Sequence, residues 1–496
     1  MGRGKAISCH GLLYFRAGLA QLAQPQSRGQ KTKFDTWVWR IQTCCSKVFW
    51  QFRLNFCKIY AKMLSKPNVG SAVLIEFSVA NFRSIREEQT LSMVASAARE
   101  DRATHVIKAP APATPDLLRS AIIYGANAAG KSNLLNALLT FERLVVDPGA
   151  GSKAAKLRHK PFLMDSDSHG EPTRFQVSFV QEGVRYQYGV SYDSSRIWSE
   201  ELYAFPEGRA QKWFVRGVND AGQDVYDYGS ALKGKKRTWE ESTRPNALFL
   251  ATGVDLNSDQ LQRVFTWFED RVRLLNPLVP LATEYTARSS SESETRKVRV
   301  MEFLGQADLG ISGFEVSEAP YDLSTMPDDT PDELKRFVLS RLKDEVVQTI
   351  GIVHRSADGS ETMLDLAEES SGTRKLFSIA GAWIDSLENG YIVLIDELDT
   401  SLHPLMLQYL VKTFHDPNIN VGNAQLIFTT HDTNVIPLFR RDQVWVMEKD
   451  SELKSTLTPI SDFSPRKNEN LEKGYLEGRF GGVPILGKPE FWQGKD

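Results

Sequence analysis

The stretch "AIIYGANAAGKSNLLNALLTFERLV", residues 121–145, constrains the fold more than any other part of the chain. A short apolar run precedes a glycine loop, and leucines then recur at the spacing of an amphipathic helix. The loop fits the pattern G-x-x-x-x-G-K-[ST] in full, and Gly125 and Gly130 let backbone N–H groups point at phosphate oxygens. The helix adds its positive end. The sequence therefore predicts a strand, a phosphate-binding loop and a helix in an α/β domain.

Side chains of this loop region are candidates for nucleotide contact. Lys131 is expected to bridge the β and γ phosphates, and Ser132 is expected to hold Mg²⁺. Asn127 in the loop and Asn133 in the first helical turn are further candidates. A chance match to the pattern would not bring a strand and a helix with it. A nucleoside triphosphate and Mg²⁺ are therefore the expected cofactors.

A second element follows far downstream, where the apolar run of "YIVLIDELD" ends in Asp396 and Glu397. At the end of a buried strand, Asp396 can hold the metal through water, and Glu397 can orient or deprotonate an attacking water. A solvated strand end would show the same letters. Together with the phosphate loop, however, the acidic pair indicates nucleotide hydrolysis.

The nucleotide is expected to be ATP. A GTPase needs the guanine-reading pattern [NT]-K-x-D after the phosphate loop, and the only match, Thr32 to Asp35, precedes the loop. A small-molecule kinase has no need of an acidic pair so far downstream. These two classes are therefore disfavoured.

The stretch "EESSGTRKL" resembles a degenerate ABC signature motif, with Ser370 and Gly372 in the serine and second-glycine positions. Ser371 replaces the first glycine, and Thr373 replaces the glutamine. Because Ser370 opens a helix, its hydroxyl and the following amides could bind a phosphate held by another subunit. A serine helix cap would explain the same letters.

Three further residues, His431, Arg83 and Ser84, match positions of ABC-type ATPases, whereas His403 does not. In "LIFTTHD", His431 lies where those proteins carry a switch histidine that touches the γ phosphate. In "ANFRSI", Arg83 and Ser84 match a stretch that opens SMC, RecF and OLD-like heads and lies near the nucleotide. In "LDTSLHP", His403 replaces the usual aspartate, which departs from the pattern. The sequence does not identify the glutamine of the Q-loop.

From Val73 onward the chain resembles OLD-like and RecF-like ABC-type ATPases, of the bacterial "AAA family ATPase" kind often found in phage-defence operons. The "LHP" ending and the tail "NENLEKGYLEGRFGGVPIL" support this resemblance. It implies an α/β fold: a P-loop NTPase of ABC-ATPase type, with a mixed β-sheet lobe, an α/β lobe and a helical insertion. It also implies ATP hydrolysis and an ATP-dependent head-to-tail dimer or higher oligomer. No TOPRIM nuclease is expected in this chain, so a separately encoded effector, such as a nuclease, is the expected partner.

Sequence patterns predict several other elements. A strand is expected from Val73, and "TRFQVSFV" and "RYQYGVSY" are expected to form a hairpin. Amphipathic helices are expected over 258–275 and 331–350, with a polar loop at 286–297. The expected domains are an N-terminal lobe at 73–253, a mainly helical insertion at 254–359 and a C-terminal lobe at 360–496.

The first 72 residues differ in composition from the rest. Their Lys and Arg outnumber their single acid, Asp35, by eleven, so residues 73–496 carry a net charge of −13, against −2 for the whole chain. All cysteines also lie there, and a cysteine-free body fits a reducing cytoplasm. We expect this leader to be disordered or non-native, with Met63 or Val73 as the true start. A targeting segment or an interfacial helix is the alternative. No apolar run is long enough to span a membrane.

Two other functions remain open from the sequence. A RecF-like repair ATPase would bind DNA, but the acidic body does not support nucleic-acid binding. The basic cluster Lys233, Lys235, Lys236 and Arg237 is a candidate phosphate contact, although a charged hairpin tip explains it better. A nucleotide-sensing scaffold with little turnover is the other alternative. Glu397 argues against it, because a sensor needs no general base.

Overall fold

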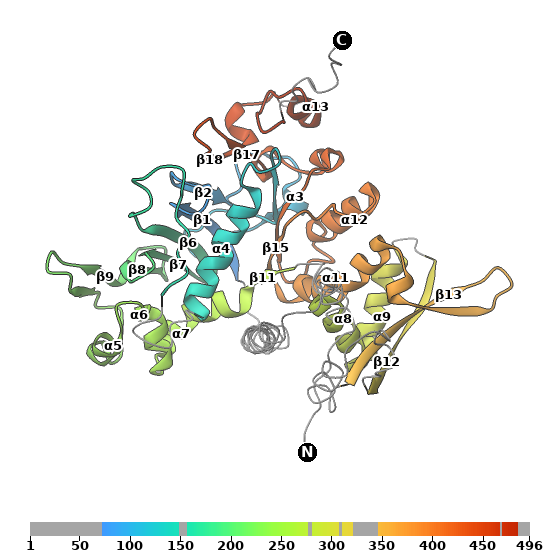
Figure 1. Cartoon of the computed structure of the whole chain (residues 1–496), viewed down its shortest axis with the longest axis horizontal. Helices are drawn as coiled ribbons and strands as arrows, with labels where there is room; N and C mark the ends of the chain where they lie inside the picture. The colour runs from blue at the N-terminus through green and yellow to red at the C-terminus, as the bar shows by residue number, and fades with distance from the viewer. Residues whose placement is uncertain are drawn as a thin grey trace, which may run out of the picture. The chain divides into compact units, whose positions relative to one another are not determined.

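The computed structural model describes residues 72–147, 156–275, 280–306, 310–320, 346–466 and 469–484 (Figure 1). These residues divide into two compact units. The first unit contains residues 72–275 and 386–484, and the second lies within 276–385. The domain boundaries predicted from the sequence, at 253/254 and 359/360, differ from the borders of these units. Residue 253 lies inside helix α6 (Phe249–Asp255), whose buried Leu250 belongs to the core of the first unit. The leader falls almost wholly outside the described residues.

The first unit begins with a seven-stranded antiparallel sheet in the order β10-β9-β8-β7-β6-β1-β2. Its strands are β1 (Val73–Ala80), β2 (Gln89–Ser92), β6 (Thr173–Gln181), β7 (Val184–Tyr192), β8 (Ile197–Phe205), β9 (Gln211–Val218) and β10 (Asp224–Tyr228). The predicted hairpin is confirmed as β6 and β7. Glu182 and Gly183 form its turn with φ values of 52° and 74°, the left-handed backbone that two-residue hairpin turns favour.

The second sheet of this unit is largely parallel, in the order β11-β15-β16-β5-β17-β18. Its strands are β11 (Val272–Leu274), β15 (Ile392–Ile395), β16 (Gln425–Thr429), β5 (Ser120–Tyr124), β17 (Val444–Lys449) and the antiparallel edge strand β18 (Ser455–Pro459). The central strands β15, β16 and β5 are buried throughout, as expected for strands covered on both faces. The parallel layer predicted from the sequence is confirmed.

Helix α4 (Lys131–Val146) follows the glycine loop and packs against the antiparallel sheet. The ring of Phe141 lies 5.2 Å from that of Phe175 and is stacked 5.7 Å from that of Tyr188. Figure 1 shows α4 beside β6 and β7. Buried residues of both sheets and of α4 form one hydrophobic cluster. The glycine loop is therefore anchored on both sides by a common core.

The remaining elements of the first unit are short. They are α3 (Arg102–His105), β3 (Val106–Ile107), β4 (Leu117–Leu118), α5 (Lys236–Ser242), α7 (Asp259–Thr266), a π-helix (Trp267–Arg271), α12 (Pro404–His415), the 3-10 helices η4 (Thr433–Leu438), η5 (Arg441–Gln443) and η6 (Ile460–Phe463), and α13 (Leu471–Leu476). The helix predicted over 258–275 is only partly correct. Its end forms β11, because Val272 to Leu274 pair in parallel with β15.

The second unit contains α8 (Pro280–Glu292), α9 (Glu294–Gly305), β12 (Ile311–Pro320), β13 (Val346–Arg355), β14 (Glu361–Asp365) and the 3-10 helix η3 (Leu366–Glu368). Helix α11 (Ser371–Asn389) starts in this unit and ends in the first. Strands β12, β13 and β14 form an antiparallel sheet. The insertion that was expected to be mainly helical therefore also contains a sheet.

Two local predictions in the second unit are wrong. The stretch 286–297 is not a loop but belongs to α8 and α9. The hydroxyls of Ser290 and Ser291 donate to carbonyls one turn back, and Ser293 caps α9 by accepting from the N–H of Arg296. Hydroxyls satisfied in this way are tolerated inside a helix. The helix predicted over 331–350 is wrong at its C-terminal end, because residues 346–350 lie in β13. Residues 331–345 lie outside the described residues.

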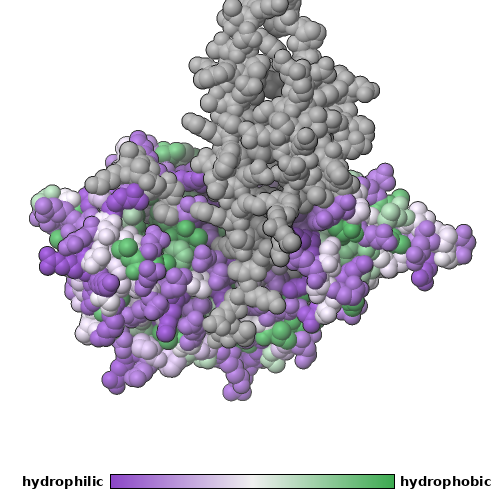
Figure 2. All heavy atoms as spheres, turned by 90° about the horizontal axis from the view of Figure 1, so that it is seen from below, coloured by the Kyte–Doolittle hydropathy of each residue, from purple (hydrophilic) through white to green (hydrophobic). Residues whose placement is uncertain are grey.

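The face of the molecule drawn in Figure 2 is mostly hydrophilic where residues are described, with small, scattered hydrophobic areas. Within the described ranges, no helix combines the length and the apolar character needed to cross a membrane.

Candidate functional site

The phosphate loop, the acidic pair and His431 meet at one edge of the parallel sheet. In the register of the sheet, Ile395 of β15 pairs with Phe428 of β16, and Thr429 of β16 pairs with Ile123 of β5. The loops that follow these three strands therefore leave the sheet side by side. In open α/β sheets, this carboxyl edge is where ligands bind.

The glycine loop has a backbone that side chains would disturb. Gly130 precedes α4 with a φ of 113°, and a Cβ atom there would lie 2.3 Å from the Ser455 hydroxyl oxygen. A Cβ atom on Gly125 would lie 2.3 Å from the carbonyl oxygen of Met447. Both motif glycines are thus required by close neighbours as well as by backbone curvature.

Lys131 is buried, with 7% of its surface exposed. Its ammonium donates to the carbonyl oxygens of Gly125 at 2.8 Å and Ala126 at 3.2 Å, and lies 3.4 Å from Nε2 of His431. Burial lowers the pKa of Lys131, and the nearby carboxylates of Asp396, Glu397 and Asp399 oppose this change. The phosphate-loop cation and the downstream acids therefore share one electrostatic environment.

Thr429, at the end of β16, organises the acidic pair. Its hydroxyl donates to Oδ1 of Asp396 at 2.6 Å and accepts from the backbone N–H of Glu397 at 2.8 Å. Glu397 is exposed and has a φ of 52°. A left-handed backbone at a residue other than glycine is strained, and such strain clusters at functional sites. The strain is held by Thr429 and by the bond from Leu398 N–H to the Thr429 carbonyl, 3.0 Å long.

His431 and Asp399 are linked next to this pair. The backbone N–H of His431 donates to Oδ2 of Asp399 at 3.2 Å, and the His431 side chain is exposed. The other carboxylate oxygen of Asp399 is buried and has no hydrogen-bond partner within the described part of the chain. Asp399 was not a predicted site residue, although it closely follows Glu397 in the sequence.

Arg83, Ser84 and Asn133 are brought together behind the loop. The Arg83 guanidinium donates to Asn133 Oδ1 at 3.1 Å, and Asn133 Nδ2 donates to the Ser84 hydroxyl at 2.7 Å. Ser455 of β18 donates to the carbonyl oxygen of Ala129 at 2.6 Å and lies 2.8 Å from the Ser84 hydroxyl. These bonds tie β18 and the turn after β1 to the base of the loop.

The other predicted residues are placed differently. Asn127 is exposed in the loop, and Ser132 is half-buried in the first turn of α4. Ser370 and Gly372 belong to the second unit. The exposed Ser370 accepts through its hydroxyl from the N–H of Thr373 at 3.1 Å, so it caps α11. His403 likewise caps α12, since its Nδ1 accepts from the N–H of Leu405.

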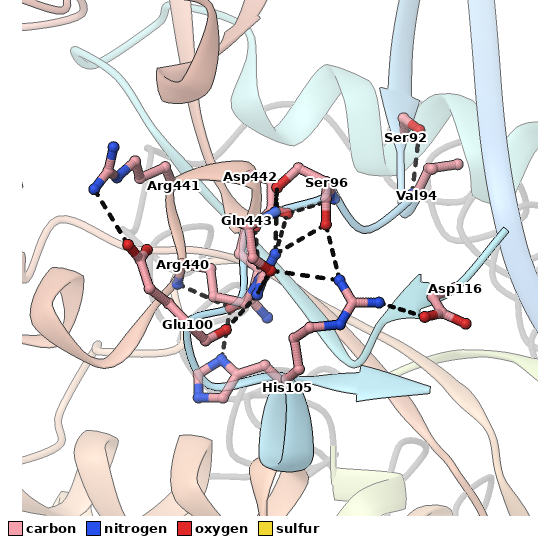
Figure 3. Close-up of polar contacts among 12 residues, drawn as sticks. Ser92, Val94, Ser96, Glu100, His105, Asp116, Arg440, Arg441, Asp442 and Gln443 are labelled. Atoms are coloured by element: carbon pink, nitrogen blue, oxygen red, sulfur yellow. Dashed lines mark hydrogen bonds and ion pairs between the residues drawn. The ribbon is translucent and has the colours of Figure 1, made fainter. Parts of the chain in front are cut away.

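A second polar cluster surrounds Arg440 (Figure 3). The Arg440 guanidinium donates to both carboxylate oxygens of Asp442, at 3.0 and 2.7 Å, and Asp442 accepts from the N–H of Ser96. A neighbouring cavity of about 210 Å³ is lined by Ser96, Ala98, Glu100, Arg440, Arg441, Asp442, Ser461, Ser464 and Pro465. Arg441 lies 3.5 Å from Glu100. These charges are paired with one another and tie η5 to residues 96–100, so the cluster has a structural role.

Several contributors to the site were missed by sequence reasoning. They are Thr429, Asp399 and Ser455. Thr429 and Ser455 carry no local signal, because a hydroxyl in a strand gains meaning only from its tertiary neighbours.

Comparison with functionally curated proteins found no match. Among solved structures, the SMC head domain from Thermotoga maritima matches with a TM-score of 0.34 and 12% identity, over 78% of this chain and 98% of that one. The recombination mediator protein RecF with ATP matches with a TM-score of 0.29 and 15% identity, over 72% of this chain and 93% of that one.

A family model matches residues 120–228 and 256–436, which include the phosphate loop, the acidic pair and His431. The predicted α/β fold of a P-loop NTPase is confirmed: the first unit joins an antiparallel-sheet lobe to an α/β lobe with a phosphate loop. The chain belongs to the family described as "AAA domain, putative AbiEii toxin, Type IV TA system".

Proposed function

We propose that this protein binds ATP with Mg²⁺ and hydrolyses it. The observation that carries the proposal is the convergence of Lys131, the acidic pair and His431 at one sheet edge, with Lys131 Nζ 3.4 Å from His431 Nε2. These groups come from three loops that are far apart in the sequence. A helix cap or a solvated strand end, considered alone, would not require them to meet.

Phosphate binding follows from the loop and α4. The loop amides and the positive end of α4 attract an anion. Lys131 already donates to two loop carbonyls, and it would exchange these contacts for oxygens of the β and γ phosphates. Its ammonium is already held close to where those phosphates would lie. The Lys131 side chain would therefore lose little conformational entropy when ATP binds.

The donor set fits Mg²⁺. Within the described residues, no group of three or more His, Cys, Asp or Glu is placed to hold a metal, so a cage made only of protein ligands is absent there. Mg²⁺ in nucleotide sites needs only one or two protein oxygens, with water and phosphate completing the shell. The hydroxyl of Ser132 and the carboxylate of Asp396 would be these ligands. The ion would neutralise charge on the phosphates.

Glu397 is the proposed general base. It would take a proton from a water molecule as the water oxygen bonds to the γ phosphorus, and the bond to the ADP oxygen breaks to give ADP and phosphate. The hydrogen bond from the Glu397 N–H to Thr429 fixes the backbone of the base. His431 would contact the γ phosphate and stabilise its charge.

We further propose that two copies associate head to tail on ATP, with Ser370 and Gly372 of one copy completing the site of the other. Ser370 and Glu397 are both exposed, which leaves them accessible to a second copy. The family description names a "putative AbiEii toxin, Type IV TA system". We propose a role in bacterial anti-phage defence. The ATPase cycle would then control a separately encoded effector, such as a nuclease.

The test is ATP binding and phosphate release by the full chain and its Lys131→Ala variant. The matched control is Lys108→Ala, which removes an exposed lysine. Lys131→Ala should weaken ATP binding at least about tenfold, since charge-assisted bonds to phosphate are lost. Lys108→Ala should behave like the parent. Equal ATP affinity in Lys131→Ala and the parent would reject this site.

A further inference from the structure

The end of the described chain, residues 469–484, packs against the phosphate loop. It consists of α13 and a turn in which Gly478, Gly481 and Gly482 have φ values of 76°, 72° and 70°. Figure 1 shows α13 beyond the ends of β17 and β18. Tyr475 is 7% exposed and Phe480 is fully buried, so the segment is part of the folded core.

One set of contacts joins this segment to the phosphate loop. A Cβ atom on Gly482 would lie 2.4 Å from Val446 and 3.4 Å from the Cα of Gly125, so the two glycine backbones are close neighbours. The N–H of Gly482 donates to Glu448 at 2.6 Å, and the Tyr475 hydroxyl donates to the Gly482 carbonyl at 3.2 Å. Burial raises the pKa of Tyr475, and a hydrogen bond with the Gly125 backbone opposes the rise. Gly482, whose carbonyl accepts from Tyr475, therefore lies against the residue whose carbonyl holds Lys131.

A second set of contacts joins the same segment to the loop that carries His431. The ring of Tyr475 lies 5.2 Å from that of Tyr124, and the Tyr124 hydroxyl donates to the carbonyl oxygen of Asp432 at 2.8 Å. The hydroxyl of Thr433 donates to Glu472 at 3.0 Å. Asp432 and Thr433 directly follow His431, so α13 holds the backbone that carries this histidine.

We propose that residues 469–484 act as a brace that fixes the distance between the phosphate loop and His431, with Tyr475 and Glu472 as positioning residues. The inference rests on the proposed ATPase function and adds a structural control of the same site. The brace closes a chain of contacts that runs from Lys131 through Gly125, Gly482, Tyr475 and Tyr124 to the His431 loop. Since a displacement of about 1 Å can cost about 100-fold in rate, its loss should affect turnover more than ATP affinity.

Glu472 offers a matched pair of variants. Glu472→Gln keeps an oxygen that accepts from Thr433, whereas Glu472→Ala removes it. We expect Glu472→Ala to lower kcat about fivefold or more, with a change in the Kd for MgATP below about threefold, and Glu472→Gln to restore most of the rate. Leu476→Ala, on the same helix with Leu476 56% exposed, should retain the parental kcat. An unchanged kcat in Glu472→Ala, or equal losses in the Ala and Gln variants, would overturn the brace.

Hydrogen–deuterium exchange of the nucleotide-free protein separates this proposal from the proposed function. Glu472→Ala and Tyr475→Ala should exchange faster than the parent in both 125–132 and 430–434, whereas Leu476→Ala should not. Tyr475→Phe keeps the ring against Tyr124 and should protect 430–434 better than Tyr475→Ala does. A parent that hydrolyses no ATP would refute the proposed function, and the brace would then be judged by exchange alone. Unchanged exchange of either loop in Glu472→Ala and Tyr475→Ala would refute the brace.

Discussion

At the scale of single residues, the site depends on one buried hydroxyl that the motifs do not include. Thr429 is fully buried and joins Asp396 to the backbone of Glu397. Both bonds are made by the same oxygen, so its removal leaves one carboxylate and one N–H without their partner. The strained backbone of Glu397 would then lose a main restraint.

Thr429→Val should therefore impair hydrolysis strongly while keeping the shape of the side chain. Loss of these hydrogen bonds should cost about 1–3 kcal/mol of unfolding free energy. Phosphate release should fall about tenfold or more, because the proposed base is no longer held. Thr429→Ser, which keeps the hydroxyl, is the control in both urea unfolding and phosphate-release assays. Parental turnover in Thr429→Val would show that the hydroxyl does not position the acids.

The residue scale also shows what local sequence can predict. Lys131, Asp396 and His431 were found because each belongs to a short pattern with a known mechanical role, and the structure brings all three together. Their catalytic and binding roles remain predictions. Asp399 and Ser455 escaped because their partners lie tens to hundreds of residues away in the chain. For Ser370, the motif is visible in the sequence, but its capping bond to Thr373 fits both the signature-motif and the helix-cap interpretation.

At the scale of elements, buried strands and caps were predictable, whereas segments governed by tertiary pairing were not. The run at 392–395 is apolar throughout and could hardly be anything but a central strand. Residues 272–274 continue a helical pattern, yet they join the sheet because β15 offers a free edge in register. The serines at 289–291 suggested a loop, since only the structure shows their hydroxyls bonded to α8 carbonyls.

The elements of the parallel sheet also meet at a buried pair of histidines. The rings of His105 and His415 lie 3.8 Å apart, His105 Nδ1 is 2.7 Å from Gln443, and His415 Nε2 is 2.7 Å from the Ser120 hydroxyl. Burial lowers the pKa of His415, and the charges of His105 and Arg119 lower it further. Burial also lowers the pKa of His105; Gln443, Asp101 and Asp442 oppose this effect, while Arg440 adds to it.

This pair predicts a loss of stability in mild acid. In the unfolded chain each imidazole takes up a proton near pH 6.5, whereas the folded state resists protonation until lower pH. The unfolding free energy should therefore be complete above about pH 6.5 and fall below it, by up to about 1.4 kcal/mol per pH unit for each proton. Urea unfolding between pH 7.5 and 5.5 measures this slope. His415→Gln should flatten it, and His169→Gln, at an exposed site, should not. Identical slopes in the parent and His415→Gln would contradict the assignment.

At the scale of the whole molecule, the two compact units contain different residues of the proposed ATPase site. The phosphate loop, the acids and His431 belong to the first unit, and Ser370 and Gly372 belong to the second. The sequence predicted these motifs but not the extent of the units, because a boundary depends on which surfaces pack. The same holds for the tail, where Gly482 lies beside Gly125 and Tyr475 beside Tyr124, each more than 300 positions away in the chain.

A shared site between two copies can be tested by mixing inactive variants. Lys131→Ala damages the phosphate loop, and Ser370→Arg blocks the surface offered to the other copy. Each alone should be inactive, but a mixed dimer contains one intact composite site. With random pairing, about a quarter of parental hydrolysis should return if the two sites act independently. Sedimentation of Glu397→Gln with ATP should show a dimer. No recovery together with a monomer in sedimentation would end the shared-site proposal.

The central claim is that Glu397 activates water at a site that binds MgATP through Lys131. The most direct measurement is phosphate release from MgATP by Glu397→Gln, with ATP binding measured on the same preparation. Removing the base but keeping the shape should abolish release, at least about 100-fold, and leave ATP affinity within about threefold of the parent. Glu241→Gln, at an exposed helical position, should release phosphate like the parent. Parental phosphate release by Glu397→Gln would contradict the account.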